Sequence, residues 1–563
     1  MDVSFLADWV KRELFGPWER LEVTDTLGRL TEVHEGFVGA TVRTGAYVYD
    51  GRDRILELED GNQDRWRYRY DLAGRVEQVG RSDGGAVFED YVGYDWNGPD
   101  PSCMYEGTRG ASGCVVLWTY DDLGRTTTKT MVDPSGTVTT GWAWDRDPNN
   151  PLSEWLGVRH ATFDLSGSTT YAYDAGPFGR LGQLTGTTRT FNGGTTASFA
   201  RTYDSAGNVL TETWPSGRTV ARTYHDNGEL SSASVSGAPG GPTYDVDVTY
   251  DAQYGLPDGY ALTAISANGS FTVDATIERN TSTQVSDETW VRSVGGAPLA
   301  NQTVAYLWGE GLLRAKQVNS SDPISYTYDG LRRIDAVYGD ANIYVTPAAT
   351  PFETYQHDVA GNPTVTSARL PAAQGGGQQG YTYDPSPEFS EVGFRSHTGA
   401  QTVDRFAYDA VSRLTSWNTE VQGQVTKART FQYDGAGRLR VQGGATPVDY
   451  RYDVDDQLVE EVRGSPANPS VVRRFEGWRW QQTGNVTTEQ VLPMLRLSGP
   501  LATVVATEPD GHAVLTVRRW EVHRPPGGVL EEGPPRRQPR VDRRAPPIVP
   551  RTMGGRSSGA NAP

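Results

Sequence analysis

Residues 68–76 read Tyr-Arg-Tyr-Asp-Leu-Ala-Gly-Arg-Val, and close relatives of this stretch recur along the chain. Tyr68 and Tyr70 are two residues apart, so in an extended strand both side chains point to the same face. Asp71 followed by Gly74 suits a type I turn, because the carboxylate can cap free amides and glycine tolerates a strained backbone. The two residues after the glycine would then begin a return strand. The stretch therefore predicts a strand, a tight turn and a second strand.

The relatives of this stretch form a repeat whose aspartates are mostly 19 to 30 residues apart. A period in this range is typical of stacked repeat architectures. We assign the tyrosine, aspartate, glycine and arginine positions of the repeat a structural role. The copies that define the motif are Tyr47, Tyr49 and Asp50; Tyr68, Tyr70, Asp71, Gly74 and Arg75; Tyr120, Asp121, Gly124 and Arg125; Tyr171, Tyr173 and Asp174; Tyr326, Tyr328 and Asp329; Tyr408 and Asp409; Tyr433, Asp434, Gly437 and Arg438; and Tyr452 and Asp453.

The physics of the repeat favours one coiled sheet. A single hairpin is marginal in water, whereas hairpins that pair edge to edge form a continuous sheet. Aromatic neighbours in such a sheet contribute roughly 0.2–1 kcal/mol per pair. Strand twist makes the sheet coil rather than stay flat. The arginine after the glycine can reach a neighbouring aspartate or lie on a tyrosine ring. We therefore expect an all-β, repetitive β-hairpin array.

The composition agrees with many short strands and excludes some partners. The 563 residues include 65 Gly, 28 Tyr and 15 Trp, which are the residues of turns and strands. The net charge of −18 repels nucleic acid and anionic membranes. No apolar run approaches the roughly 18 residues of a membrane span. The N-terminus lacks the basic and apolar regions of a signal peptide. We expect no nucleic-acid partner and no membrane span.

The chain divides into four parts by pattern. Residues 1–20 show a weak helical spacing of apolar residues, which predicts a short helix. The repeat array occupies residues 21–460, and within it residues 252–325 hold eroded copies. Residues 461–520 form a degenerate, strand-rich end. Residues 521–563 are rich in Arg, Pro and Gly and are expected to be disordered, because proline supplies no ladder donor.

The last of these parts differs in charge from the rest. It holds eight Arg against four acids, a net charge of +4. Because the whole chain carries −18, the residues before position 521 carry a net charge of −22. A stretch of this composition is also produced when a GC-rich gene is read out of frame, which is our hypothesis for it. The competing interpretation is a basic tail that binds an anionic partner.

The two cysteines leave two interpretations open. Cys103 and Cys114 flank a glycine-rich stretch and could face each other across a hairpin as a disulfide. They could equally be two free thiols. Two cysteines do not make a disulfide scaffold in either case.

Motifs that carry chemistry are weak in this sequence. Residues 80–84 match the Gly-x-Ser-x-Gly hydrolase pattern, but a strand-like stretch follows where a helix is required, which favours a hairpin turn. Residues 145–149 resemble the start of a calcium loop without its sixth and twelfth positions. The seven histidines are dispersed and show no metal-ligand spacing. We predict no catalytic residue, no cofactor and no metal site.

The pattern Tyr-x-Tyr-Asp-x-x-Gly-Arg of residues 68–75, with variants at 118–125 and 431–438, resembles the RHS/YD-repeat family. The resemblance covers roughly residues 20–460. It implies a long β-sheet that spirals into a hollow or partly open β-shell. It also implies that the shell encloses a C-terminal polypeptide, commonly a toxin, as in bacterial polymorphic toxins. The array with no coherent catalytic constellation predicts a non-enzymatic shell protein.

The resemblance carries further expectations and one departure. Bacterial members close with a segment similar to Asp-Pro-x-Gly-Leu, where self-cleavage frees the toxin. This segment and a toxin domain are not recognisable here, so the cleavage is carried over to no residue. The implied partners are the protein's own or a neighbouring C-terminal cargo and a secretion-machine component, with export to the cell surface or beyond by a dedicated machine. The alternative is a cell-surface adhesion or carbohydrate-binding repeat protein, in which Trp142 or Trp144 stacks on sugars.

Overall fold

The computed structural model describes most of the chain. The described residues are 2–7, 10–83, 89–107, 113–145, 157–174, 183–236, 243–266, 269–299, 301–321, 323–339, 351, 353–368, 377–383, 389–396, 401–409, 411, 413–464, 469–475, 478–483, 486–491, 503–507 and 514–518. Residues 521–563, for which disorder is expected, lie outside this description.

All regular elements of the described residues are β-strands, and they form one antiparallel sheet of 44 strands. Each strand pairs with the next one along the chain, except that β24 pairs with both β25 and β26. The sheet is not closed into a barrel. The predicted all-β hairpin array is therefore confirmed.

The strands up to residue 328 are β1 (Asp2–Ala7), β2 (Val10–Phe15), β3 (Trp18–Thr24), β4 (Leu30–Phe37), β5 (Ala40–Tyr49), β6 (Ile55–Asp60), β7 (Asp64–Tyr70), β8 (Val76–Asp83), β9 (Glu89–Asn97), β10 (Asp100–Glu106), β11 (Val116–Tyr120), β12 (Thr126–Asp133), β13 (Gly136–Trp144), β14 (Arg159–Asp164), β15 (Gly167–Tyr173), β16 (Leu184–Phe191), β17 (Thr196–Tyr203), β18 (Val209–Thr213), β19 (Thr219–Tyr224), β20 (Leu230–Ser236), β21 (Thr243–Tyr250), β22 (Pro257–Ser266), β23 (Gly269–Arg279), β24 (Val285–Val294), β25 (Ala297–Pro298), β26 (Gln302–Gly309), β27 (Leu312–Val318) and β28 (Ile324–Tyr328). The strands after residue 328 are β29 (Ile334–Tyr338), β30 (Glu353–His357), β31 (Pro363–Ala368), β32 (Gly377–Tyr383), β33 (Phe389–Ser396), β34 (Gln401–Tyr408), β35 (Leu414–Val421), β36 (Gln424–Tyr433), β37 (Leu439–Gly443), β38 (Val448–Tyr452), β39 (Leu458–Arg463), β40 (Ser470–Phe475), β41 (Trp478–Thr483), β42 (Val486–Val491), β43 (Thr503–Thr507) and β44 (Val514–Arg518).

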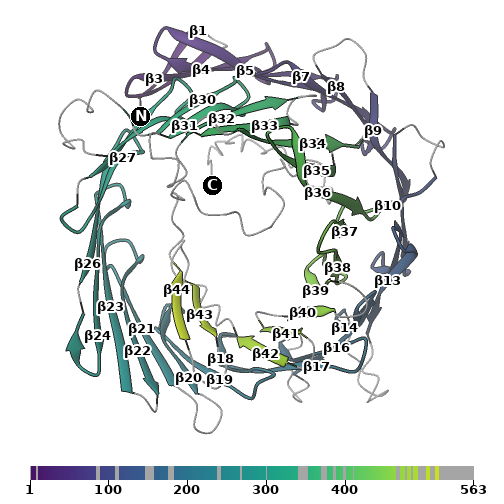
Figure 1. Ribbon diagram of the computed structural model, residues 1–563. Helices are drawn as coiled ribbons and strands as arrows, with labels where there is room; N and C mark the ends of the chain where they lie inside the picture. The colour runs from purple at the N-terminus through teal and green to yellow at the C-terminus, as the bar shows by residue number, and fades with distance from the viewer. Residues whose placement is uncertain are drawn as a thin grey trace, which may run out of the picture.

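The sheet curls until it passes its own beginning. In Figure 1 the strands follow one another around a ring from β1 through β10, β20 and β26, and β30–β36 then return beside the strands with which the ring began. The indole of Trp18 donates to the backbone oxygen of Asp329 at 2.8 Å, which fixes the point where the second passage begins. We call residues 2–328 the first round and residues 329–518 the second round. The curl is the accumulated right-handed twist of consecutive strands.

The first residues of the chain are strands, so the expected helix over residues 1–20 is wrong. The hairpin of β1 and β2 continues into β3, with Val10 opposite Val23. Lys11 lies between two carboxylates, at 2.6 Å from Glu13 and 3.5 Å from Glu22 across the ladder. A helix of this length is marginal by itself, whereas a strand gains a ladder partner on the growing sheet.

Burial alternates along the strands as a one-sided sheet requires. In β21 the side chains of Tyr244, Val246 and Val248 are buried, while the residues between them are exposed. The apolar cluster around Phe199 and Trp214 also holds Val459, which belongs to the second round. The core is therefore a band along one face of the sheet, joined in places by the next round.

The described residues within 252–325 and 461–520 continue the same sheet. The first range contributes β22–β27, and the second contributes β40–β44. The turn between β23 and β24 has Asn280 in the aspartate position: its Oδ1 accepts the amides of Ser282 at 2.9 Å and Gln284 at 3.1 Å. The eroded copies thus keep the turn geometry with altered side chains.

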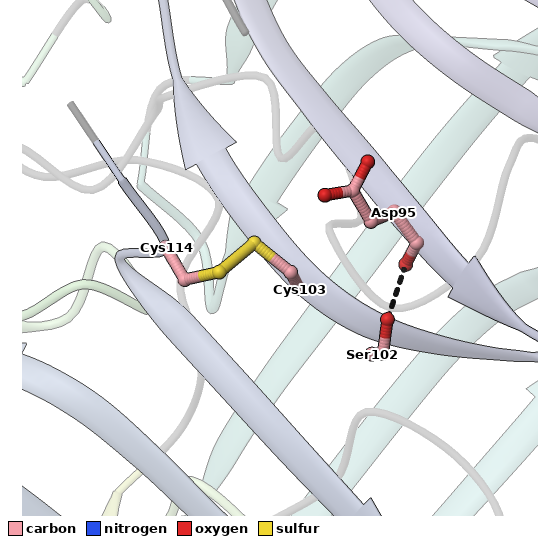
Figure 2. The surroundings of a disulfide bond; sticks show 4 residues. All are labelled: Asp95, Ser102, Cys103 and Cys114. Carbon is pink, nitrogen blue, oxygen red and sulfur yellow. Dashed lines mark hydrogen bonds between the residues drawn. A yellow bond between two sulfur atoms is a disulfide. The ribbon is translucent and has the colours of Figure 1, made fainter. Parts of the chain in front are cut away.

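The two cysteines form a disulfide between β10 and the segment that leads into β11. Their Cα atoms are 5.5 Å apart, and 11 positions separate them in sequence. Figure 2 shows the bridge beside Ser102, whose hydroxyl donates to the backbone oxygen of Asp95 at 3.3 Å. A bridge that closes a loop of this length stabilises a fold by about 3 kcal/mol in the chain-entropy view.

The fourth position of the turns adopts a left-handed backbone, which glycine tolerates best. Gly74 has φ of 90°, and the same position holds Thr283 with φ of 62° in the eroded copy. Threonine is β-branched and resists this conformation.

Thr283→Gly is therefore expected to raise the free energy of unfolding by about 1 kcal/mol, since a left-handed L-residue costs roughly 1–2 kcal/mol. The shift of the thermal unfolding midpoint measures it. Thr281→Gly is the matched control, because Thr281 lies in the same turn without a positive φ. That control is expected to lower the midpoint. Equal shifts in both variants would contradict the assignment of strain to position 283.

Candidate functional site: the repeat turn and the seam between rounds

The turn of the repeat is built around one aspartate carboxylate. Oδ1 of Asp71 accepts the amide of Arg75 at 2.9 Å, and Oδ2 accepts its guanidinium Nε at 2.7 Å. The amide of Gly74 donates to the Asp71 backbone oxygen at 3.0 Å. The side chain thereby closes the turn and fixes the arginine at the same time. The same bond from arginine Nε to aspartate Oδ2 recurs in the pairs Asp25–Arg29, Asp50–Arg54, Asp121–Arg125, Asp329–Arg333, Asp409–Arg413 and Asp434–Arg438.

The fixed arginine holds the aromatic residue of the next copy. The guanidinium carbon of Arg54 lies 4.4 Å from the ring centroid of Tyr70. The Tyr70 hydroxyl donates to the backbone oxygen of Ile55, the residue after that arginine, at 2.7 Å. The arginine and the residue after it therefore both contact the second aromatic residue of the copy that follows. Guanidinium–ring contacts of this kind also join Arg29 to Tyr49, Arg75 to Trp96, Arg125 to Trp144, Arg413 to Tyr433 and Arg438 to Tyr452.

The hydrogen bond from the second aromatic residue is equally regular. Tyr120, Tyr173, Tyr328 and Tyr452 donate to the backbone oxygens of Pro101, Arg159, Leu313 and Leu439, all between 2.6 and 2.8 Å. The first aromatic residues, such as Tyr68, Tyr171, Tyr326 and Phe406, are buried or partly buried in the sheet face, and Tyr408, a second aromatic residue, is also partly buried. Burial raises the pKa of Tyr433 to about 12. These residues act as structural contacts between copies.

The two tryptophans proposed to stack on sugars are both partly buried in the sheet. The indole of Trp144 donates to the backbone oxygen of Thr126 at 2.8 Å and lies against Arg125. Trp142 is only partly exposed on the same strand. Carbohydrate binding stays a prediction.

The residue at the fifth position of each turn influences the pKa of the aspartate at the first position. The hydrogen bond from Arg54 lowers the pKa of Asp50 to about 2. Asp453 has Gln457 at that position and receives only backbone amides, from Asp455 at 2.9 Å and Gln457 at 2.8 Å. Burial, together with the neighbouring carboxylates of Asp455 and Asp164, raises the pKa of Asp453 to about 6.

The second round is joined to the first along a seam of side chains. We call the turns that begin at the aspartate of the repeat motif, such as those at Asp71, Asp121 and Asp434, the Asp turns. In a meander, turns alternate between the two rims of the sheet, and these turns lie on one rim. At the seam, the Asp turns of the second round contact the opposite hairpins of the first. Asp358 accepts a hydrogen bond from Asn62 at 2.8 Å, and Arg413 binds Glu106 through two nitrogens at 2.7 and 3.0 Å.

The seam contacts include one fully buried ion pair and others that are partly buried. Arg440 Nε lies 2.5 Å from Asp133, and both side chains are at most 5% exposed. Lys129 reaches Asp456 at 3.2 Å, and burial lowers the pKa of this lysine. Near the end of β16, Arg473 donates to the Thr195 hydroxyl at 2.6 Å.

The partners across the seam are between 278 and 327 positions apart in sequence. These pairings could not be predicted from the sequence, because this spacing does not appear as a repeat. Glu106 and Asp133 lie outside the motif, at hairpins that the pattern leaves undefined. The one available signal was charge at the ends of the opposite hairpins, which by itself names no partner.

The motifs that suggested chemistry do not gather into a site. Ser82 lies within β8, in a strand that pairs with β7 and β9. The described residues contain no cluster of three metal-ligating side chains, and no helix among them is long and apolar enough to span a membrane. A cleft of about 300 Å³ lies at the start of the seam and is lined by Trp18, Arg20, Glu35 and Arg332 among others.

Part of the repeat array matches a known protein family. Residues 408–447, which hold the turns at Asp409 and Asp434, match the family model described as RHS Repeat. This segment of the chain is therefore similar to an RHS repeat. No curated protein matches this chain by sequence.

Solved structures share the fold of this chain. The crystal structure of TcdB2-TccC3 matches with a TM-score of 0.60 at 14% identity, covering 90% of this chain and 28% of that one. The crystal structure of TcdB2-TccC3-TEV matches with a TM-score of 0.54 at 12% identity, covering 89% and 31%. This chain therefore shares the fold of these structures, and it spans less than a third of the length of their chains.

The buried pair of Arg440 and Asp133 predicts a large asymmetry between single and double variants. Arg440→Met should lower the free energy of unfolding by roughly 3–5 kcal/mol, because it leaves a buried carboxylate without its cation. Adding Asp133→Asn should recover much of this loss. Denaturant unfolding measures both.

The control for that pair is Arg405→Met. Arg405 is 52% exposed and pairs with Glu420 at 3.0 Å within the second round, so its loss should cost about 1 kcal/mol or less. If Arg405→Met lowered the free energy of unfolding as much as Arg440→Met, the seam ion pair would stabilise the protein no more than an exposed ion pair does.

The raised pKa of Asp453 predicts a pH-dependent gain from Gln457→Arg. Between pH of about 4 and 6 the unfolded chain releases this proton before the folded chain does, so rising pH removes stability. The added arginine should lower the pKa and stabilise the protein above pH 6 by up to about 3 kcal/mol, with little gain at pH 4. The difference in unfolding midpoint between variant and parent at the two pH values measures it. A gain independent of pH would refute the assignment.

Proposed function

We propose that this chain is a wall segment of an RHS-type shell that encloses or presents a toxin-type polypeptide carried C-terminal to the repeats. The observation that supports this proposal is the seam. The sheet passes its own beginning, and contacts such as the buried ion pair of Arg440 with Asp133 join the two rounds there. A sheet that is fastened to itself becomes a curved wall with an inner and an outer side. Nothing in this role requires a catalytic residue.

The ladder itself makes such a wall impermeable to polypeptide. Neighbouring strands in a sheet are about 4.8 Å apart, which is narrower than the roughly 10 Å that a packed chain occupies. Among the described residues, every strand is hydrogen-bonded to the next one along the chain, except that β24 pairs with both β25 and β26. The wall therefore supports separation of a cargo from proteases and from the producing cell.

Charge supports the same role. The residues before position 521 carry a net −22, whereas residues 521–563 carry +4. An acidic wall attracts a basic polypeptide, and this attraction weakens as salt increases.

The disulfide supports a location outside the reducing cytosol. Disulfides persist in secreted and surface proteins and are rare in cytosolic ones. The bond between Cys103 and Cys114 therefore favours export, for which we propose a dedicated secretion machine as partner.

A protease-sensitive reporter peptide fused after residue 563 tests the shielding. It should be cleaved roughly tenfold more slowly than the same reporter fused before residue 1, since cleavage then requires opening of the wall. Arg440→Met, which opens the seam, should remove the difference. Equal cleavage of both reporters on the parent chain would contradict shielding, and electron micrographs of a solid globule would contradict the wall.

A further inference from the structure

The disulfide stands at one of the shortest ladders of the described sheet. Strands β10 and β11 share only two register pairs, Cys103 with Leu117 and Met104 with Val116. By contrast, β9 and β10 share six pairs. The covalent bond from Cys103 to Cys114 therefore supplies a cross-link at a junction that backbone hydrogen bonds hold poorly.

Both ends of the bridged loop touch the second round. Glu106, just after Cys103, binds Arg413 of the turn that begins at Asp409. Val115 follows Cys114, and it lies so close to the next Asp turn that a Cβ at Gly435 would be 2.0 Å from its backbone oxygen.

A chain of backbone hydrogen bonds continues this contact. Val132 donates to the Val115 oxygen at 3.0 Å, and Gly435 donates to the Val132 oxygen at 2.6 Å. Met104, Val116 and Met131 form a buried cluster, against which Ala436 of the second round packs. The bridged loop and the residue after it therefore contact two consecutive turns of the second round, those that begin at Asp409 and Asp434.

We propose that this disulfide is a thiol-sensitive clasp of the seam. Cys103 is only 6% exposed, while Cys114 is exposed and can be attacked by a thiolate from solvent. Two equivalents of a small thiol reductant transfer two electrons: the sulfur–sulfur bond breaks, both cysteines become thiols, and the reductant leaves as its own disulfide. The reaction balances without any other reagent.

Reduction frees the loop to change its closure distance. Glu106 and Val115 then no longer hold a fixed spacing, so the contacts to Arg413 and Gly435 loosen together. The wall is fastened at this point in oxidising surroundings and released in reducing ones. This inference rests on the proposed wall, but it concerns the seam and requires no cargo.

Hydrogen–deuterium exchange of the full purified chain, with and without dithiothreitol, tests the clasp. Reduction should speed exchange at the amides of Val132 and Gly435 roughly tenfold, because the loop regains conformational freedom. Amides near the distant seam contact of Arg473 and in β23 should exchange as before.

Cys103→Ser combined with Cys114→Ser is the matched variant. It should exchange rapidly at the two seam amides without reductant and should not respond to it. Unchanged exchange in the reduced parent would overturn the clasp, and faster exchange throughout the sheet would show a general stabiliser instead. The exchange readout is independent of the reporter cleavage, so failure of the clasp and failure of the shielding are told apart.

Discussion

The carboxylate at the start of each repeat turn is the constraint on which the rest depends. In the copy at Asp71 one side chain accepts a backbone amide with one oxygen and a guanidinium with the other. The first bond shapes the turn, and the second holds the arginine above the aromatic ring of the next copy. Charge-assisted hydrogen bonds of this kind are stronger than neutral ones. A local turn thus sets the spacing between hairpins, and the spacing sets how the sheet curls.

The seam uses the same turns for a second purpose. Arg413 closes its own turn with Asp409 and simultaneously binds Glu106 of the first round. Arg438 likewise binds its own Asp434 and donates to the sulfur of Met131 of the first round at 3.0 Å. Because these arginines are already fixed by their own aspartates, they lose little freedom when they bind across the seam. The repeat motif is therefore both the unit of propagation and the fastening between rounds.

The parts of this molecule that sequence predicted are the local ones. Asp71 and Arg75 are four positions apart, so the turn, the return strand and the period can be inferred from the chain itself. The pairing of Arg440 with Asp133 spans 307 positions and depends on the summed twist of all intervening strands, which no local pattern contains. The helix expected over residues 1–20 failed for a related reason. A ladder partner decided the conformation there, and weak periodicity did not.

The span of the seam fixes the number of hairpins in the first round. Each Asp turn of the second round meets one particular opposite hairpin, as Asp358 meets Asn62. Duplicating or deleting a single hairpin before residue 328 would move every later turn to the wrong neighbour. Copies at the far end of the array carry no such restriction. Recombination between similar copies, to which repetitive genes are prone, should therefore be tolerated mainly near the end of the spiral, and the first round should keep a constant count.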